Sequence, residues 1–406
     1  MNFIKNITGK SSHIQKTTFR LTPYSPVFVG SGNNWVKGLD FDCTNGQTVF
    51  YDLHRLFKDQ IHEVEKLEHV LKNRSIRRYL KQSSLSLKNY TKLVINGQCE
   101  ASELMEPVTD GNGNPIIPGS SLKGSIRSAI FAKLFEDSQL SENEYSKLIK
   151  GKKVSSRRLE QKLLTTYQRN KNGSSPNFDI GRAIRIGDIS FGLENLEVFN
   201  SIIINETHKG FQWKKLGRGS KKNTQNIGDS TKVSASAISY SDDVIAEPSF
   251  TISIDKKVLK DISWDHSLDF KFIAETCNRL SKRLIDADLQ YMKAAKENIP
   301  NIQTVKEDLG IIADDVDACI DEINNGNGIS WIQRVGWGTG WLSKTGAHSY
   351  LPVKNSDKDY HDVLKKIAQF LFKRSKGYPF PKTRNIVLDR YGQPATTMGW
   401  VLVEMV

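Results

Sequence analysis

A glycine turn followed by a regular apolar pattern constrains the fold of this chain most strongly. The turn is Pro118-Gly119-Ser120-Ser121-Leu122-Lys123-Gly124, and it follows the short apolar pair Ile116-Ile117. The apolar side chains after the turn recur at four-residue spacing, at Ile126, Ile130 and Leu134. This spacing predicts a helix with one buried face, and Ser120 or Ser121 can cap its first turn.

Other segments alternate between the patterns of strands and of helices. The predicted strands are residues 17–29, 183–189, 250–254 and 399–403, and the predicted helices are residues 52–82, 272–287, 301–323 and 363–371. Asp52 is the predicted N-cap of the first of these helices. Strands interleaved with helices twice over predict an α+β fold with two halves.

Composition suggests where the halves divide. Residues 209–236 are rich in glycine, lysine, serine and asparagine and contain few apolar side chains. We expect this segment to be a mobile basic loop. The predicted domains are residues 1–208, which include a polar, helical insertion over residues 136–178, and residues 237–406.

The chain is basic, with 58 lysines and arginines against 45 acidic residues and a formal net charge of +13. A surplus of this size favours polyanionic partners, although a basic surface without a special role remains an alternative. The cations gather in three runs, at residues 66–81, 150–162 and 209–222, whereas residues 307–322 are acidic. The folded molecule should therefore have distinct electrostatic faces.

Several functional classes find no support in the sequence. Four cysteines stand far apart without a Cys-x-x-Cys pair, which predicts neither a zinc site nor a disulfide framework. The first residues lack the apolar core of a signal peptide, and no apolar run approaches the ~18 residues of a membrane span. We expect a cytoplasmic protein that binds no metal and does not contact a membrane.

The turn at Pro118–Gly124 has the chemistry of an anion site. Glycine permits close approach of the backbone, and the start of a helix presents unpaired N–H groups. Ser120, Ser121 and Lys123 would reinforce such a site. Local sequence alone leaves a capped helix start with a chance lysine as an equal alternative. The spacing does not match a Walker A loop.

A second glycine motif lies near the other end of the chain. Gly336, Gly338 and Gly340 alternate with other residues, and each costs ~0.5–1 kcal/mol relative to alanine in a regular strand. Close approach to a sugar-phosphate chain would offset this cost, with Arg334 and Lys344 supplying charge. Trp337 and Trp341 could stack on bases, but we expect both to lie in the core. The spacing does not fit a dinucleotide-binding motif.

Catalytic clusters are scarce. The eight histidines are scattered, and the sequence contains no His-Glu-x-x-His motif, no Gly-x-Ser-x-Gly elbow and no evident carboxylate pair. A metal-free ribonuclease would need a general base such as His13 or His54 beside bound RNA. Nothing in the sequence positions one there, so we predict no catalytic residue.

Four motifs, taken in order, resemble the RAMP superfamily of CRISPR-associated RNA-binding proteins. They are Gly30-Ser31-Gly32 after a first strand, Ile117-Pro118-Gly119-Ser120-Ser121-Leu122-Lys123-Gly124, Ile186-Gly187-Asp188, and Arg334-Val335-Gly336-Trp337-Gly338-Thr339-Gly340. The length and the ending at residues 381–401 are most similar to the fifth-subunit family of type III-A (Csm) interference complexes. Phe28 stands where many relatives carry a histidine, which argues against borrowing any histidine chemistry.

The resemblance implies a fold and a set of partners. The fold would be two ferredoxin-like (RRM-type) domains with helical and loop insertions. The protein would be non-catalytic, without cofactors, and would hold the 3′ region of the CRISPR RNA at one end of the complex. Its protein partners would be other Csm subunits, especially the repeated RAMP backbone subunit and the small helical subunit. Host nucleases recruited for CRISPR RNA maturation would also be partners.

The candidate RNA-binding residues combine these motifs with nearby charge. They are Gly30, Ser31, Gly32, Ser120, Ser121, Lys123, Gly124, Arg127, Arg334, Gly336, Gly338, Gly340 and Lys344. We expect the four cations of this set to contact phosphates. The alternatives are a RAMP-type endoribonuclease that processes precursor CRISPR RNA and a related subunit of a type III-B complex.

A cleavage assay distinguishes a non-catalytic RNA-binding subunit from a RAMP-type endoribonuclease. The purified protein, incubated with repeat RNA in the absence of added metal, should bind the RNA without cutting it, because no acid–base set is evident in the sequence. Gel analysis of end-labelled RNA measures this. Cleavage at one defined position would favour the endoribonuclease.

Overall fold

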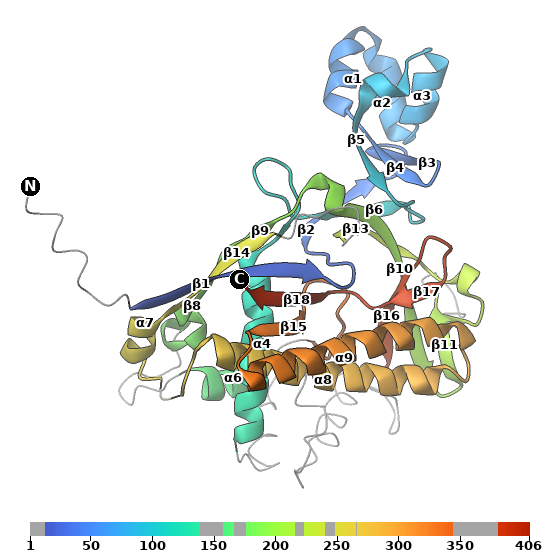
Figure 1. Ribbon diagram of the computed structural model, residues 1–406. Helices are drawn as coiled ribbons and strands as arrows, with labels where there is room; N and C mark the ends of the chain where they lie inside the picture. Colours follow the sequence, from blue (N-terminus) through green and yellow to red (C-terminus); the bar gives the residue numbers. More distant parts are fainter. Residues whose placement is uncertain are drawn as a thin grey trace, which may run out of the picture.

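The computed structural model describes residues 13–138, 157–165, 176–215, 223–239, 248–264, 266–343 and 381–406. Within these ranges the chain forms two main sheets and a two-stranded one, and helices pack beneath the sheets (Figure 1). The α+β class predicted from the sequence is confirmed. None of the helices in these ranges combines the length and the apolar composition needed to cross a membrane.

The first sheet has five strands within the described residues, drawn from both ends of the chain. Their order is β15 (Ser330–Arg334), β18 (Trp400–Met405), β1 (Ile14–Pro23), β14 (Ser249–Asp255) and β8 (Ile184–Ile186). β14 lies antiparallel between β1 and β8, and the helix α4 (Gly119–Asp137) lies between β1 and β8 in the sequence. β1 and β8 are therefore parallel, and this split βαβ arrangement is typical of a ferredoxin-like half.

The second sheet is organised around the long strand β10 (Leu196–Thr207). The main order is β2 (Gly30–Val36), β6 (Glu103–Pro107), β13 (Val233–Ile238), β10, β5 (Thr91–Asn96), β4 (Gln47–Tyr51) and β3 (Phe41–Thr44). The side strands are β11 (Gly210–Lys214), β12 (Asn223–Thr224), β16 (Thr383–Leu388) and β17 (Pro394–Thr396). A separate pair joins β7 (Ile116–Ile117) to β9 (Ile189–Ser190).

Two long helices, α8 (Phe270–Ala295) and α9 (Gln303–Asn325), run side by side along one side of the molecule (Figure 1). α8 contains the predicted helix at residues 272–287, and α9 covers the predicted helix at residues 301–323 except for its first two residues. α8 begins where Phe272 N donates to the Asp269 carboxylate, and α9 ends at Gly326, whose left-handed backbone suits glycine. Of the shorter helices, α6 (Arg157–Leu164) packs against α4, and α7 (Lys256–Asp261) packs against β1 and the 3-10 turn at Ile180–Ala183.

The main core lies between the first sheet and helices α4, α8 and α9. Phe19 of β1 makes edge-on contacts with Phe270 and Trp331, each at 5.3 Å between ring centroids. Strands from both predicted domains share each main sheet, since β1 pairs with β18 and β10 pairs with β16. The expected boundary at residues 209–236 therefore does not separate the sheets.

A helical insertion, defined here as residues 52–90, connects β4 to β5. It contains α1 (Leu53–Asp59), α2 (Val64–Lys72) and α3 (Ile76–Gln82), with 3-10 turns at Ile61–Glu63 and Leu87–Tyr90. Asp52 accepts a hydrogen bond from Arg55 N at 2.9 Å, so the predicted N-cap is confirmed. The insertion has its own small core and stands out from the molecule on the side opposite α8 and α9 (Figure 1).

The prediction of a mobile loop over residues 209–236 is wrong for its described parts, which form β11, β12 and β13. Phe211 and Trp213 alternate with polar residues and are buried, and β11 pairs with β10. Aromatic burial against a neighbouring strand thus outweighs the polar composition. The predicted helix at residues 363–371 lies outside the described residues, as does most of the predicted insertion at residues 136–178.

A buried ionic group connects α8 with both sheets. Asp288 of α8 accepts from Arg334 Nη1 of β15 at 2.9 Å and from Arg384 Nε of β16 at 2.5 Å. The second positive charge is offset by the carbonyl of Met398, which accepts from Arg334 Nε at 2.8 Å. It is also offset by aromatic faces, because Arg334 lies over Trp400 and Arg384 over Tyr291.

Replacing Asp288 should destabilise the fold strongly. Asp288→Asn leaves two buried guanidinium groups without a countercharge, which should lower the free energy of unfolding by about 3–5 kcal/mol. Denaturant unfolding followed by circular dichroism measures this change. Asp286→Asn removes the same charge at an exposed position of the same helix and should change stability little. Equal effects of the two substitutions would contradict this account.

Candidate functional site

Helix α4 begins at the predicted turn, but its N-terminus is not capped by a serine. The N-cap position is Pro118, and Gly119 N donates to the Asp188 carboxylate at 2.8 Å. A Cβ on Gly119 would lie well under 3.0 Å from the carbonyl oxygen of Ile186. Glycine is therefore required at this position because the helix start packs directly against the end of β8.

Most of the backbone N–H groups that were predicted to bind an anion at the start of this helix already have partners within the protein. Ser121 N and Leu122 N both donate to the Pro118 carbonyl, and the Asp188 carboxylate occupies Gly119 N. A carboxylate at a helix N-terminus is stabilised by the helix dipole and would repel a second anion. The first turn of α4 is thus a filled anion site, which the sequence did not predict.

The exposed face of α4 begins with Ser120 and Gly124, four residues apart. Within the described ranges, no atom beyond the nearby backbone of the helix and the two chain neighbours lies within 4 Å of the place where a Cβ on Gly124 would stand. This glycine lies inside a helix, where alanine would be more stable by about 1 kcal/mol, and neither backbone conformation nor packing requires it. The open space beside Gly124 is the feature of the turn that the fold does not explain.

The two cations of the turn behave differently. Arg127 pairs with Glu160 at 2.9 Å and with Asp179 at 2.8 Å, so its charge is already matched and the expected phosphate contact is not available without breaking these pairs. Lys123 is half-buried and lies near Asp179 and Arg185; burial, together with the two arginines, lowers its pKa. Among the residues that the structure describes, Lys123 is the cation of α4 without a side-chain hydrogen bond or ion pair, so it remains open to an incoming anion.

The C-terminal glycine loop bends tightly, with left-handed backbone at Gly336, Gly338 and Gly340. A Cβ on Gly336 would collide with the carbonyl of Phe28, and one on Gly338 would collide with Met398 and Asn385. Both glycines are therefore needed for packing as well as for conformation. Gly340 differs, because no atom of the described residues other than its chain neighbours lies within 4 Å of its Cβ position.

The N-terminal motif lies beside this loop. Trp337 N donates to the carbonyl of Phe28 at 2.7 Å, and the rings of Phe28 and Trp337 meet edge-on at 6.1 Å. Gly30 and Gly32 lie at an irregular start of β2, where Ser31 Oγ donates to Glu106 at 2.9 Å. Gly32 has left-handed backbone and open space above it.

The three motifs of the sequence are linked in space. Ser125 Oγ of α4 donates to the carbonyl of Arg334 at 3.0 Å, where the C-terminal loop begins, and Phe28 connects that loop to β2. We define the glycine surface by its exposed members, which are Gly30, Ser31, Gly32, Ser120, Gly124, Gly336, Trp337 and Gly340. The contacts of Ser125, Phe28 and Asp188, which hold this surface together, were not predicted from the sequence, since each connects residues far apart in the chain.

Two further predictions at the C-terminal loop need correction. Arg334 is buried against Asp288 and Trp400, so it supports the loop from inside and does not face a phosphate. Trp337 is 39% exposed instead of lying in the core, whereas Trp341 is partly buried and packs against the core as expected. Lys344 lies outside the described residues.

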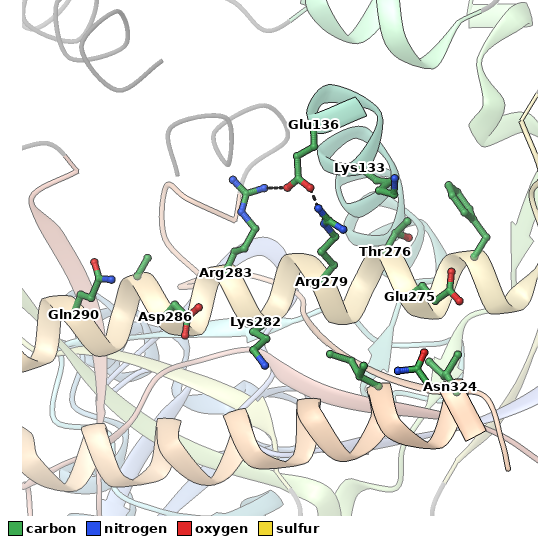
Figure 2. Close-up of a pocket in the computed structure, with 14 residues that line it drawn as sticks. Lys133, Glu136, Glu275, Thr276, Arg279, Lys282, Arg283, Asp286, Gln290 and Asn324 are labelled. Atoms are coloured by element: carbon green, nitrogen blue, oxygen red, sulfur yellow. Dashed lines mark hydrogen bonds and ion pairs between the residues drawn. The ribbon is translucent and has the colours of Figure 1, made fainter. Parts of the chain in front are cut away.

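A separate cavity of about 630 Å³ lies at the other end of α4, against α8 and the last turns of α9 (Figure 2). Glu136 stands at its wall and pairs with Arg279 at 2.6 Å and with Arg283 (Figure 2). Its distance from Gly119 along the helix is about 25 Å at 1.5 Å per residue. The paired charges tie α4 to α8, and the cavity does not adjoin the glycine surface.

The described ranges contain no cluster of metal-ligating side chains. No group of three or more histidine, cysteine, aspartate or glutamate side chains there could hold a metal ion. The cysteines of the same ranges are free, and burial raises the pKa of the Cys277 thiol far above its usual range. The glycine surface offers close approach, one exposed aromatic ring and a nearby cation, which together suit binding of a chain-like anion.

Comparison with known proteins agrees with this description. Residues 20–299 match the RAMP superfamily. One chain of a cryo-EM structure of a Csm–crRNA–target RNA ternary complex, from a type III-A CRISPR–Cas system, superposes with a TM-score of 0.63 at 18% identity, covering 96% of this chain and all of that one. The crystal structure of T. onnurineus Csm5 gives a TM-score of 0.49 at 17% identity, covering 95% of this chain and 99% of that one. No curated protein matches the sequence.

The two glycines of α4 should respond oppositely to the same substitution. Gly119→Ala places a methyl group against the β8 backbone and should lower the free energy of unfolding by about 1–3 kcal/mol. Gly124→Ala fills open space in a helix and should raise it by about 1 kcal/mol. Denaturant unfolding of both variants measures the difference. Destabilisation by Gly124→Ala would show that this position has a packing role.

Proposed function

Because the chain belongs to the RAMP superfamily, we propose that it is an RNA-binding subunit of a type III-A (Csm) CRISPR interference complex. Its likeness in fold to one chain of such a complex extends over 96% of its length. Its partners are then the CRISPR RNA and the neighbouring Csm subunits. The net charge of +13 agrees with a polyanionic partner.

The observation that carries this proposal is the open space beside Gly124, Gly32 and Gly340. Left-handed backbone accounts for glycine at positions 32 and 340, but the fold gives no reason for glycine at position 124. A sugar-phosphate backbone lying across α4 would need this space. Lys123 would then meet a phosphate, and the exposed ring of Trp337 would stack on a base.

The finer role we propose is a cap on the 3′ region of the CRISPR RNA. In this role the subunit contacts the backbone of the RNA more than its base edges, so its sequence preference is weak. It contributes no catalytic group and supports assembly and RNA maturation. Contacts with the repeated RAMP backbone subunit and the small helical subunit, and recruitment of host nucleases, belong to the same proposal.

A matched pair of glycine substitutions tests whether RNA lies across α4 beside Gly124. Gly124→Gln puts a longer side chain into the open space and should lower the affinity for single-stranded CRISPR RNA about tenfold, which corresponds to about 1.4 kcal/mol. Gly310→Gln makes the same change in α9, at a helical glycine that also has open space, and should leave the affinity unchanged. Fluorescence anisotropy with labelled RNA measures both.

Thermal unfolding controls for folding, since glutamine favours helices more than glycine does and neither variant should lose stability. If Gly124→Gln bound RNA as tightly as the unchanged protein, the RNA would not cross α4. If the unchanged protein did not bind RNA at all, the proposed function would be wrong.

A further inference from the structure

The second half of the helical insertion carries charge of one sign. Residues 69–90 contain six lysines and arginines and no aspartate or glutamate. The first half, residues 52–68, contains five acidic residues and three lysines and arginines. The insertion is therefore basic at α3 and the chain that follows it.

Some of these cations are already engaged. Lys72 pairs with Glu68 at 2.6 Å, and Lys66 of the same helix pairs with Glu63 at 2.7 Å. Arg77 donates to the carbonyl of Cys43 at 3.1 Å and to Thr44, which anchors α3 to β3. Within the described ranges, the side chains of Arg78 and Lys81 make no hydrogen bond or ion pair.

The fold holds these two cations on one exposed face. Ile76, Tyr79 and Leu80 bury the other face of α3 in the core of the insertion. Arg78 and Lys81 are three residues apart and both exposed, so their side chains are neighbours on the helix surface.

The turn before α3 fixes the position of this face. Ile76 N donates to the Gly38 carbonyl at 3.1 Å, and a Cβ on Gly38 would collide with the carbonyl of Arg74. Arg74 itself is exposed and has a φ of 49°. A third exposed cation, Arg74, therefore precedes α3 in the chain, on backbone packed against the turn at Gly38.

The charge distribution on the rest of the molecule favours binding of an anion on the side of the insertion. Helix α9 carries seven acidic residues and one lysine, and it lies on the side of the molecule opposite the insertion (Figure 1). Adjacent unmatched cations repel one another. A bound polyanion would relieve this repulsion at α3, whereas α9 would repel the same partner.

We propose that Arg74, Arg78 and Lys81 form a second RNA-contacting face, which binds backbone phosphates separately from the glycine surface. This inference rests on the proposed function, because it takes RNA as the polyanion. Arginine can hold a phosphate through two parallel hydrogen bonds and lysine through its point charge. The insertion thereby extends the RNA path beyond the sheets.

A matched pair of double variants tests this face in the full chain. Arg78→Ala with Lys81→Ala removes two unmatched cations, and Lys66→Ala with Lys72→Ala removes two cations that are paired with glutamates. RNA affinity is measured over a range of salt concentrations, with one single-stranded RNA and with the same RNA annealed to its complement. Thermal unfolding checks that both variants fold.

The first variant should bind at least one of the two RNAs several-fold more weakly, and its slope of log affinity against log salt should be shallower by about 1.4 on the single strand. The second variant should bind like the unchanged protein. An unchanged slope and affinity for Arg78→Ala with Lys81→Ala, or equal losses in both variants, would overturn this inference and leave the proposed function standing. Absence of RNA binding by the unchanged protein would overturn both.

Discussion

The carboxylate of Asp288 holds two arginines that come from two different sheets, and much of the candidate site depends on this contact. Arg334 ends β15 and leads directly into the C-terminal glycine loop, so its side chain fixes the loop from below while its carbonyl accepts from Ser125 of α4. A buried charge pair of this kind tolerates little displacement, because loss of a partner leaves a charge without compensation. The relative positions of α4, α8 and the loop are thereby fixed before any ligand arrives.

Elements with a strong local pattern were predictable from the sequence. The four-residue apolar spacing after Gly119 predicted α4, the alternation at Phe250–Ile254 predicted β14, and Asp52 was identified as a cap because capping depends on neighbouring residues alone. Glycine positions were predictable as places of close approach. Their partners were not, since Gly119 meets β8 and Gly336 meets Phe28, each far away in the chain.

The predictions that failed concern which side chains are buried in the folded chain. Arg334 was expected to contact a phosphate, but it is buried in an ion pair with Asp288, 46 residues earlier in the chain. Trp213 lies in the segment that was expected to be a mobile loop, but it is buried where β11 pairs with β10, whereas Trp337 was expected in the core and is exposed. A local pattern reports which residues are apolar or charged, whereas the sheet order decides which of them share an interior.

The helical insertion enters and leaves the second sheet at one point. Tyr51 and Thr91 face each other across β4 and β5, and Asp52 N donates to the Tyr90 carbonyl at 2.7 Å. β4 and β5 are thus already paired at the base of the insertion, so the insertion is a long hairpin loop between these two strands. Such a loop can be shortened, enlarged or exchanged for another at a cost that grows only slowly with its length. The distance to which the insertion extends from the sheet can therefore change between relatives while the register of β4 and β5 stays the same.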